Sequence, residues 1–262
     1  MESHWKTSII VSGRQLTNQT ESAYRAAILT IPKLIIACLF SAYFLPCLAL
    51  GYHVLNNQSS PGNFVFLKWS NTPVNLMLDP GTLGGEDGEK IVKEACDTWN
   101  NVPTADRLCG NFSTLPEDIT VDNYESFTSA NDGDIDVIFD ETGEILSDLG
   151  LSPGSTLGVS IVTSNSSNGQ IQNVLLVLNG SLQSNSASDL LSTTIHEMGH
   201  GWGLAHIPIG GINSVSVTPG LEPIDPEGIP SMYPFNIPTN DALGRTLEID
   251  DEIGISVRYP SN

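Results

Sequence analysis

The sequence is short of basic residues. The 262-residue chain holds 10 Lys and Arg against 30 Asp and Glu, a formal net charge of −20. Residues 52–262 alone hold 28 acidic and 6 basic side chains. A domain this acidic repels nucleic acid and anionic membrane surfaces, so neither is expected as a partner. Two explanations of the acidic excess are left open: an affinity for divalent cations, and solubility in a salty or extracellular medium.

The sequence also lacks internal repeats and is poor in cysteine. No period of the length found in solenoid proteins is visible. A length of 262 residues suits one domain of ordinary size, or one domain plus appendages. Of the four cysteines, Cys38 and Cys47 lie in an apolar segment, which leaves only Cys96 and Cys109 in the domain. In an exported protein this pair is consistent with one disulfide, and two buried thiols are the alternative.

Only one long apolar stretch is present. Residues 34–50 carry no charge, and basic residues precede them. This order is typical of a secretory signal peptide, and Ala49 and Gly51 suit cleavage before Tyr52. An uncleaved membrane anchor is the alternative, because the run is close to the shortest membrane-spanning length. We therefore predict a signal peptide or signal anchor over residues 1–51. The domain is then secreted, extracellular or periplasmic, or held at the outer face of the cell membrane.

The rest of the chain alternates between strand-like and helix-like patterns. Residues 52–67 are polar and rich in Asn and Ser, which is typical of a linker. Beyond them, β-branched apolar runs predict strands and apolar residues at helical spacing predict helices. The predicted strands are residues 74–79, 134–140, 157–164 and 171–179, and the predicted helices are residues 84–102, 188–204 and 246–259. This order predicts an α+β domain over residues 68–262, with helices packed on one sheet.

Histidine is scarce, yet three of the five histidines fall in one segment that reads HEMGHGWGLAH. His196 and His200 are four residues apart, so both imidazoles can reach one metal ion from a helix. Glu197 then lies beside the metal, where a general base is needed. Gly203 can end the helix in the left-handed conformation and let the chain return with His206 as a third ligand. Three nitrogen ligands with one open position are typical of a catalytic zinc.

The pattern HExxHxxGxxH resembles the signature of the metzincin zinc metallopeptidases. That family also carries a methionine turn beneath the metal. Met232, in the sequence SMYP, follows His206 by 26 residues and is the only methionine beyond the predicted helix. Within the metzincins, SMYP and residues 247–260 are most similar to the matrixins, and DTWNNV and DIDVIF resemble them more weakly. The resemblance covers about residues 68–260.

This resemblance implies a fold and an activity. The implied fold is a metzincin-like α+β domain with a twisted five-stranded mixed sheet, a long first helix, an active-site helix and a C-terminal helix. The implied function is a secreted zinc-dependent endopeptidase that hydrolyses protein or peptide substrates, and we expect a monomer. The implied site has one catalytic Zn²⁺ on His196, His200 and His206, Glu197 as general base, and Gly203 and Met232 as structural support. An exported or membrane-anchored zinc-binding module without turnover is the alternative.

Two features of the matrixins have no counterpart in the sequence. A second, structural zinc needs further histidines, and only His4 and His53 are left over. Residues 52–67 contain no cysteine and are too short for a matrixin pro-segment with its cysteine switch. Any latency must therefore have another origin.

One acidic cluster raises a second metal hypothesis. The segment NDGDID places Asp132, Asp134 and Asp136 at alternating positions around Gly133. It resembles part of an oxygen-ligand loop for Ca²⁺, without the glutamate of an EF-hand. A solvated acidic loop is the alternative interpretation.

Overall fold

The structure is a computed structural model that describes most of the domain and one strand near the N-terminus. The described residues are 5–14, 53–60, 63–128, 132–182, 187–206, 230–233, 235–236 and 245–261. The apolar run 34–50, the expected cleavage site and both cysteines of that run lie outside them. No helix among the described residues is long and apolar enough to cross a membrane.

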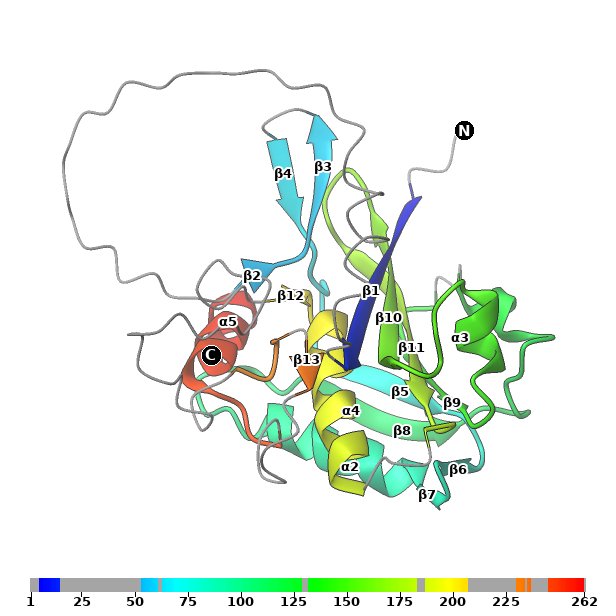
Figure 1. Cartoon of the computed structure of the whole chain (residues 1–262). Coiled ribbons are helices and arrows are strands. Elements are labelled where there is room, and N and C mark those ends of the chain that lie inside the picture. The colour runs from blue at the N-terminus through cyan, green and yellow to red at the C-terminus, as the bar shows by residue number, and fades with distance from the viewer. Residues whose placement is uncertain are drawn as a thin grey trace, which may run out of the picture.

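The described strands form a mixed sheet covered by helices, which confirms the predicted α+β class (Figure 1). Five strands follow one another in the order β8 (Cys109–Thr114), β5 (Val74–Leu78), β9 (Ile135–Asp140), β11 (Ile171–Asn179) and β10 (Thr156–Asn165). The first four are parallel, and β10 is antiparallel to β11. The sheet continues beyond β10 with β1 (Trp5–Arg14) and the two-residue β13 (Phe235–Asn236), neither of which the sequence pattern predicts.

The central strands are buried on both faces because their side chains alternate between two apolar clusters. In β11, Val174, Leu176 and Leu178 face one cluster, whereas Leu175 and Val177 face the other. A strand covered on both sides reads as a continuous apolar run, which is how this one reads in the sequence.

Different elements cover the two faces of the sheet. Helices α2 (Gly88–Asn100) and α4 (Ala187–Gly201) contribute to the first cluster. The short helix α3 (Glu144–Asp148) and the 3₁₀ turn η1 (Tyr124–Phe127) contribute to the second. A last helix, α5 (Ile249–Arg258), packs Ile255 into the first cluster. The site residues therefore lie on the face that carries the two long helices.

Helix α2 begins four residues later than predicted. The strands β6 (Thr82–Leu83) and β7 (Glu86–Asp87) form a tight hairpin first, and Gly84 and Gly85 at its turn have φ of +61° and +82°. Such values favour glycine and cannot belong to a right-handed helix. Residues 84–87 read GGED and hold no apolar residue, so the apolar spacing that starts at Ile91 does not extend into the hairpin.

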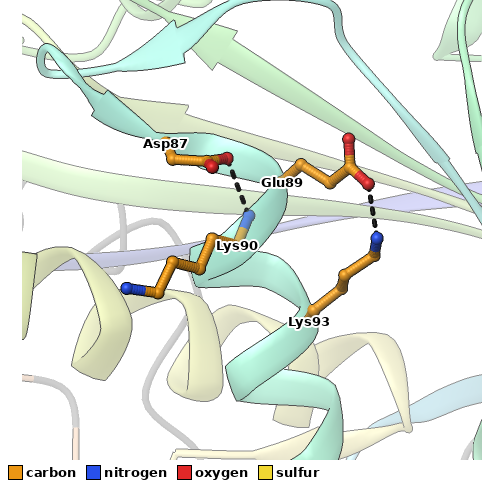
Figure 2. Close-up of polar contacts among 4 residues, drawn as sticks. All are labelled: Asp87, Glu89, Lys90 and Lys93. Atoms are coloured by element: carbon orange, nitrogen blue, oxygen red, sulfur yellow. Dashed lines mark hydrogen bonds and ion pairs between the residues drawn. The ribbon is translucent and has the colours of Figure 1, made fainter.

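Side chains at the start of α2 fix where the helix begins (Figure 2). The Asp87 carboxylate accepts a hydrogen bond from the Lys90 backbone N–H at 3.0 Å, which caps the helix. Glu89 and Lys93 form an ion pair one turn apart on the exposed side. Further along, Cys96 and Cys109 form a disulfide that joins α2 to β8, with their Cα atoms 5.8 Å apart.

Two ranges expected to lie outside the domain contain strands. β1 lies within residues 1–51, and β2 (His53–Val54), β3 (Asn56–Ser60) and β4 (Asn63–Phe66) lie within residues 52–67. β3 and β4 form a hairpin, and β2 pairs with β12 (Leu204–Ala205), directly after α4. Both ranges thus contribute strands beside the histidine segment.

Candidate metal centre

Helix α4 carries the first two histidines and the glutamate between them. It packs against α2 and against strands β10 and β11. The Trp99 indole of α2 donates a hydrogen bond to the Ile195 carbonyl at 3.0 Å. His196 is 6% exposed, and Glu197 and His200 are 0% exposed. The site therefore lies in the interior, on a helix held from both sides.

Gly203 turns the chain back toward the metal centre. Its φ is +87°, and a Cβ at this position would collide with the Leu67 carbonyl oxygen. Its N–H donates to the His200 carbonyl at 2.8 Å, which closes the end of the helix. The chain then runs through β12 to His206, so the sequence-based role of Gly203 as a left-handed helix terminator matches the observed backbone.

The three imidazoles meet through their Nε2 atoms. The His196–His200 and His196–His206 nitrogen distances are 3.1 Å, and the His200–His206 distance is 3.0 Å. His196 Nδ1 lies 2.6 Å from the Ser231 carbonyl oxygen, and His200 Nδ1 lies 2.8 Å from the Leu204 carbonyl oxygen. A carbonyl only accepts, so each Nδ1 carries the hydrogen and each Nε2 presents a lone pair.

This arrangement fits a metal ion. The lone pairs of His196 Nε2 and His200 Nε2, 3.1 Å apart, repel each other unless a cation lies between them, and His206 Nε2 completes the group of three nitrogens. Three nitrogens around a tetrahedral zinc, at about 2.0–2.1 Å from it, lie about 3.3 Å apart, close to the spacing seen here. No other group of three His, Cys, Asp or Glu among the described residues brings its ligand atoms this close together.

The surroundings keep the histidines neutral. Burial, followed by the neighbouring His206, lowers the pKa of His196 to about 3. Burial also lowers the pKa of His200 well below its usual value and that of His206 to about 4. Neutral imidazole is the form that binds a metal, so the ligand set needs no deprotonation at neutral pH.

Glu197 lies against the middle of β10. Ser160 Oγ lies 2.5 Å from Glu197 Oε2 and 3.0 Å from its carbonyl oxygen. A Cβ at Gly158 would come within 2.9 Å of Glu197 Cγ and 3.1 Å of Thr193 Cγ2. β10 therefore approaches α4 closely enough to define where the carboxylate sits. Neither Ser160 nor Gly158 could be predicted from the histidine motif, because they lie 37 and 39 positions before Glu197.

Met232 packs beneath the same helix. It is 1% exposed, and a Cβ at Gly199 would collide with its sulfur and approach Trp99 Cζ2 to 3.1 Å. Gly199 lies between the two histidines of α4, so Met232 fills the space directly behind the ligands. Gly199 is not one of the fixed positions of the HExxHxxGxxH pattern, although only its lack of a side chain leaves room for the methionine.

Asp251 attaches the turn at Ser231 and Met232 to α5. Its Oδ2 accepts hydrogen bonds from the Ser231 N–H at 2.7 Å and the Glu248 N–H at 3.1 Å, and its Oδ1 accepts from the Met232 N–H at 3.4 Å. Burial raises the pKa of Asp251 to about 6, and these N–H groups oppose the shift. The Ser231 carbonyl in turn orients His196, so support for a metal ligand reaches from the C-terminal helix.

The acidic cluster has a different arrangement. Asp132 is exposed, Asp134 is half-buried and Asp136 is buried. The Asn173 side-chain amide donates to Asp132 Oδ1 at 2.9 Å and to Asp136 Oδ2 at 3.0 Å. Burial, with Asp132 and Asp134 nearby, raises the pKa of Asp136 to about 7. The Asn173 amide group thus bridges the carboxylates of Asp132 and Asp136. Calcium binding by the three aspartates remains a hypothesis.

Comparison with known proteins adds no family. No protein-family model matches the chain, and no curated protein matches it in sequence. What can be said about function therefore rests on the residues of this site and their arrangement.

Proposed function

We propose that the chain is a zinc-dependent endopeptidase with a metzincin-like catalytic domain. The observation that carries this proposal is the convergence of three histidine Nε2 atoms, together with a buried glutamate, Glu197, that directly follows the first of these histidines on the same helix. Zinc binding alone does not need this carboxylate, so its burial next to the ligands supports turnover over a zinc-binding module. The mixed sheet, Gly203 and Met232 support the metzincin assignment.

Each side chain has a defined task in this mechanism. His196, His200 and His206 hold the zinc, which when bound polarises a carbonyl group and acidifies a water molecule. Glu197 accepts a proton from the attacking water and delivers it to the leaving amine nitrogen. Ser160 holds the Glu197 carboxylate in place through its hydroxyl. Burial strengthens each of these electrostatic contacts, because water does not screen them.

We further propose that the domain acts outside the cytoplasm, as a monomer on protein or peptide substrates. The disulfide between Cys96 and Cys109 supports an oxidising compartment. The apolar run 34–50 supports export or anchoring. The excess of acidic residues gives no support to nucleic acid as a substrate.

Glu197→Gln tests the mechanism. The variant should keep about one zinc per chain, because the ligands are untouched, and its rate on an unfolded protein substrate should fall by about 100-fold or more. Zinc is measured by elemental analysis and cleavage by release of labelled peptides. Glu144→Gln, which changes an exposed carboxylate on α3, is the matched control and should behave as wild type.

Three outcomes are distinguishable. Equal activity of Glu197→Gln and wild type would overturn the role of the glutamate. A wild-type chain that binds zinc yet cleaves no peptide bond would favour the module without turnover. Activity that survives complete zinc removal would exclude a zinc peptidase.

A further inference from the structure

The third histidine is held differently from the other two. His196 and His200 each donate from Nδ1 to a backbone carbonyl, which fixes the orientation of the ring. Within the part of the chain that the structure describes, no group accepts a hydrogen bond from His206 Nδ1. Among these residues, the position of His206 therefore depends on the backbone that leads to it, which is the turn formed by residues 201–205.

The carbonyl groups at the start of this turn are bonded to distant segments. A helix leaves its last carbonyl groups without partners inside the helix. At the end of α4, the Gly201 carbonyl accepts a hydrogen bond from the Trp69 indole N–H at 2.9 Å. The next carbonyl, that of Trp202, accepts one from the Tyr259 hydroxyl at 3.0 Å. Two aromatic side chains from outside the helix thus hold two successive peptide units between the second and third histidines.

Tyr259 connects three segments through its hydroxyl group. Its side chain is 6% exposed, and the hydroxyl accepts from the Trp69 backbone N–H at 3.1 Å while it donates to the Trp202 carbonyl. Burial raises the pKa of Tyr259, so the hydroxyl keeps its proton and remains a donor. The neighbouring Arg258 Nε donates to the same carbonyl at 3.3 Å. Figure 1 shows α5, which ends beside Tyr259, close to β12, the strand that follows α4.

The turn needs such outside support because its own residues do not fix its shape. A glycine lies on either side of Trp202, at Gly201 and Gly203, and glycine restricts the backbone least of all residues. The Gly203 carbonyl is held by the Leu55 N–H at 2.8 Å, a backbone contact that no side-chain substitution removes directly. A metal ligand must lie within about 0.2 Å of its place, so a small rotation of this turn is enough to misplace His206.

We propose that Tyr259 is a positioning residue for His206, because its hydroxyl holds the Trp202 carbonyl and so fixes the turn that carries the third metal ligand. The Trp69 indole, bonded to the preceding carbonyl, shares this role. The inference rests on the zinc centre of the proposed function. Tyr259 touches neither metal nor substrate in this role, and acts only through the backbone.

The test is Tyr259→Phe in the full chain, which removes one hydroxyl group and keeps the ring. Loss of support behind a metal ligand weakens binding about 10–100-fold, and the other donors to the turn remain, so we expect the zinc dissociation constant to rise about tenfold. Competition with a chromophoric chelator measures it. The matched control is Tyr124→Phe, because Tyr124 is 3% exposed and donates to Asp148 at 2.6 Å on the other face of the sheet. The control should lose stability in denaturant to a similar extent and bind zinc as wild type does.

Two further measurements separate positioning from a general loss of structure. In a His206→Ala background the turn carries no ligand, so adding Tyr259→Phe should change the zinc dissociation constant by less than about twofold. Co²⁺ in place of zinc reports the geometry of its ligands through its visible absorption. That spectrum should change in Tyr259→Phe and stay the same in Tyr124→Phe.

The outcomes distinguish this inference from the proposed function. Equal zinc dissociation constants for Tyr259→Phe and Tyr124→Phe would overturn the positioning role and leave the zinc centre intact. A tenfold loss that persists in the His206→Ala background would show that the hydroxyl acts on another part of the site, which also overturns it. If Tyr259→Phe does not fold, Trp69→Phe should weaken zinc binding in the same way, and unchanged binding there would refute the role of the turn. A wild-type chain that binds no zinc would instead defeat the proposed function itself.

Discussion

Removing the Asp251 side chain should loosen a metal ligand that it does not touch. The Ser231 N–H donates to Asp251 at 2.7 Å, and the Ser231 carbonyl accepts from His196 Nδ1 at 2.6 Å. In Asp251→Ala the turn loses its attachment to α5, so the carbonyl that orients His196 is free to shift. We expect weaker zinc binding together with lower stability.

The size of both effects follows from the contacts. Alanine leaves the Ser231 and Glu248 N–H groups, which bond at 2.7 and 3.1 Å, without their acceptor in a buried place. Each such loss costs about 1–3 kcal/mol. Part of this is offset because the carboxylate is itself costly to bury, as its pKa of about 6 shows. The net loss in the free energy of unfolding is then about 2–3 kcal/mol. Loss of support behind a metal ligand lowers affinity about 10–100-fold.

The assay compares zinc dissociation constants, obtained by competition with a chromophoric chelator, and denaturant unfolding of the zinc-loaded protein. Asp250→Ala, which removes the adjacent half-buried carboxylate of α5, is the control and should change zinc affinity by less than about twofold. Asp251→Asn keeps one acceptor oxygen and should fall between alanine and wild type. If Asp251→Ala lowers stability as expected while its zinc affinity equals that of the control, the proposed support of His196 is wrong.

Three further predictions concern other parts of the site and the acidic cluster. Asp136 has a pKa of about 7, above its ordinary 3.8, so its ionisation costs the folded state progressively as pH rises from about 4 to about 7. Asp136→Asn should therefore be more stable than wild type by about 4 kcal/mol at pH 8 and equal to it below pH 4 in urea unfolding. A variant that is less stable than wild type only in added calcium would instead favour a calcium site. Gly199→Ala should lower stability by about 1–3 kcal/mol, because the new Cβ meets the Met232 sulfur. Combining it with Met232→Ala should cost less than the sum of the two single changes in thermal unfolding, and strict additivity would contradict the clash. Ser160→Ala should lower kcat about tenfold with KM and zinc content nearly unchanged, because a hydrogen bond to a carboxylate is lost; an effect on KM alone would contradict a role in holding Glu197.

The sequence pattern predicted the helices and strands that are determined by neighbouring residues alone. Helix α4 and the placement of His196 and His200 on one of its faces could be read from the sequence, because a four-residue separation puts two side chains on the same face of a helix. Strands β9, β10 and β11 could be read because each is a long apolar run. Strand β8 was missed, since residues 109–114 are largely polar at the sheet edge and are ordered by pairing with β5.

The supports of the site come from distant segments and leave no local sign. Asp251 reads as an acidic residue in the first turn of a helix, which is common for electrostatic reasons alone. Its bonds to the Ser231–Met232 turn arise only when α5 packs against that turn. Ser160 reads as a polar interruption of a strand, and β1 has no pattern that assigns it to the sheet. Which segments pair across the fold is a property of tertiary packing that periodicity does not encode.

The geometry of the centre depends on few side chains, and the reason differs between them. In the proposed peptidase, the three histidines and Glu197 would be fixed by the chemistry of coordination and proton transfer. Gly199 and Gly203 are fixed by space, since a Cβ would strike Met232 at one and the Leu67 carbonyl at the other. The buried positions of the strands require only apolar residues of suitable shape, and many different sequences meet this requirement. The chain matches no family model, so the support for a metal centre comes from the contacts of these side chains. Substitutions of Gly199 or Gly203 therefore test the geometry of the centre more directly than substitutions in the sheet.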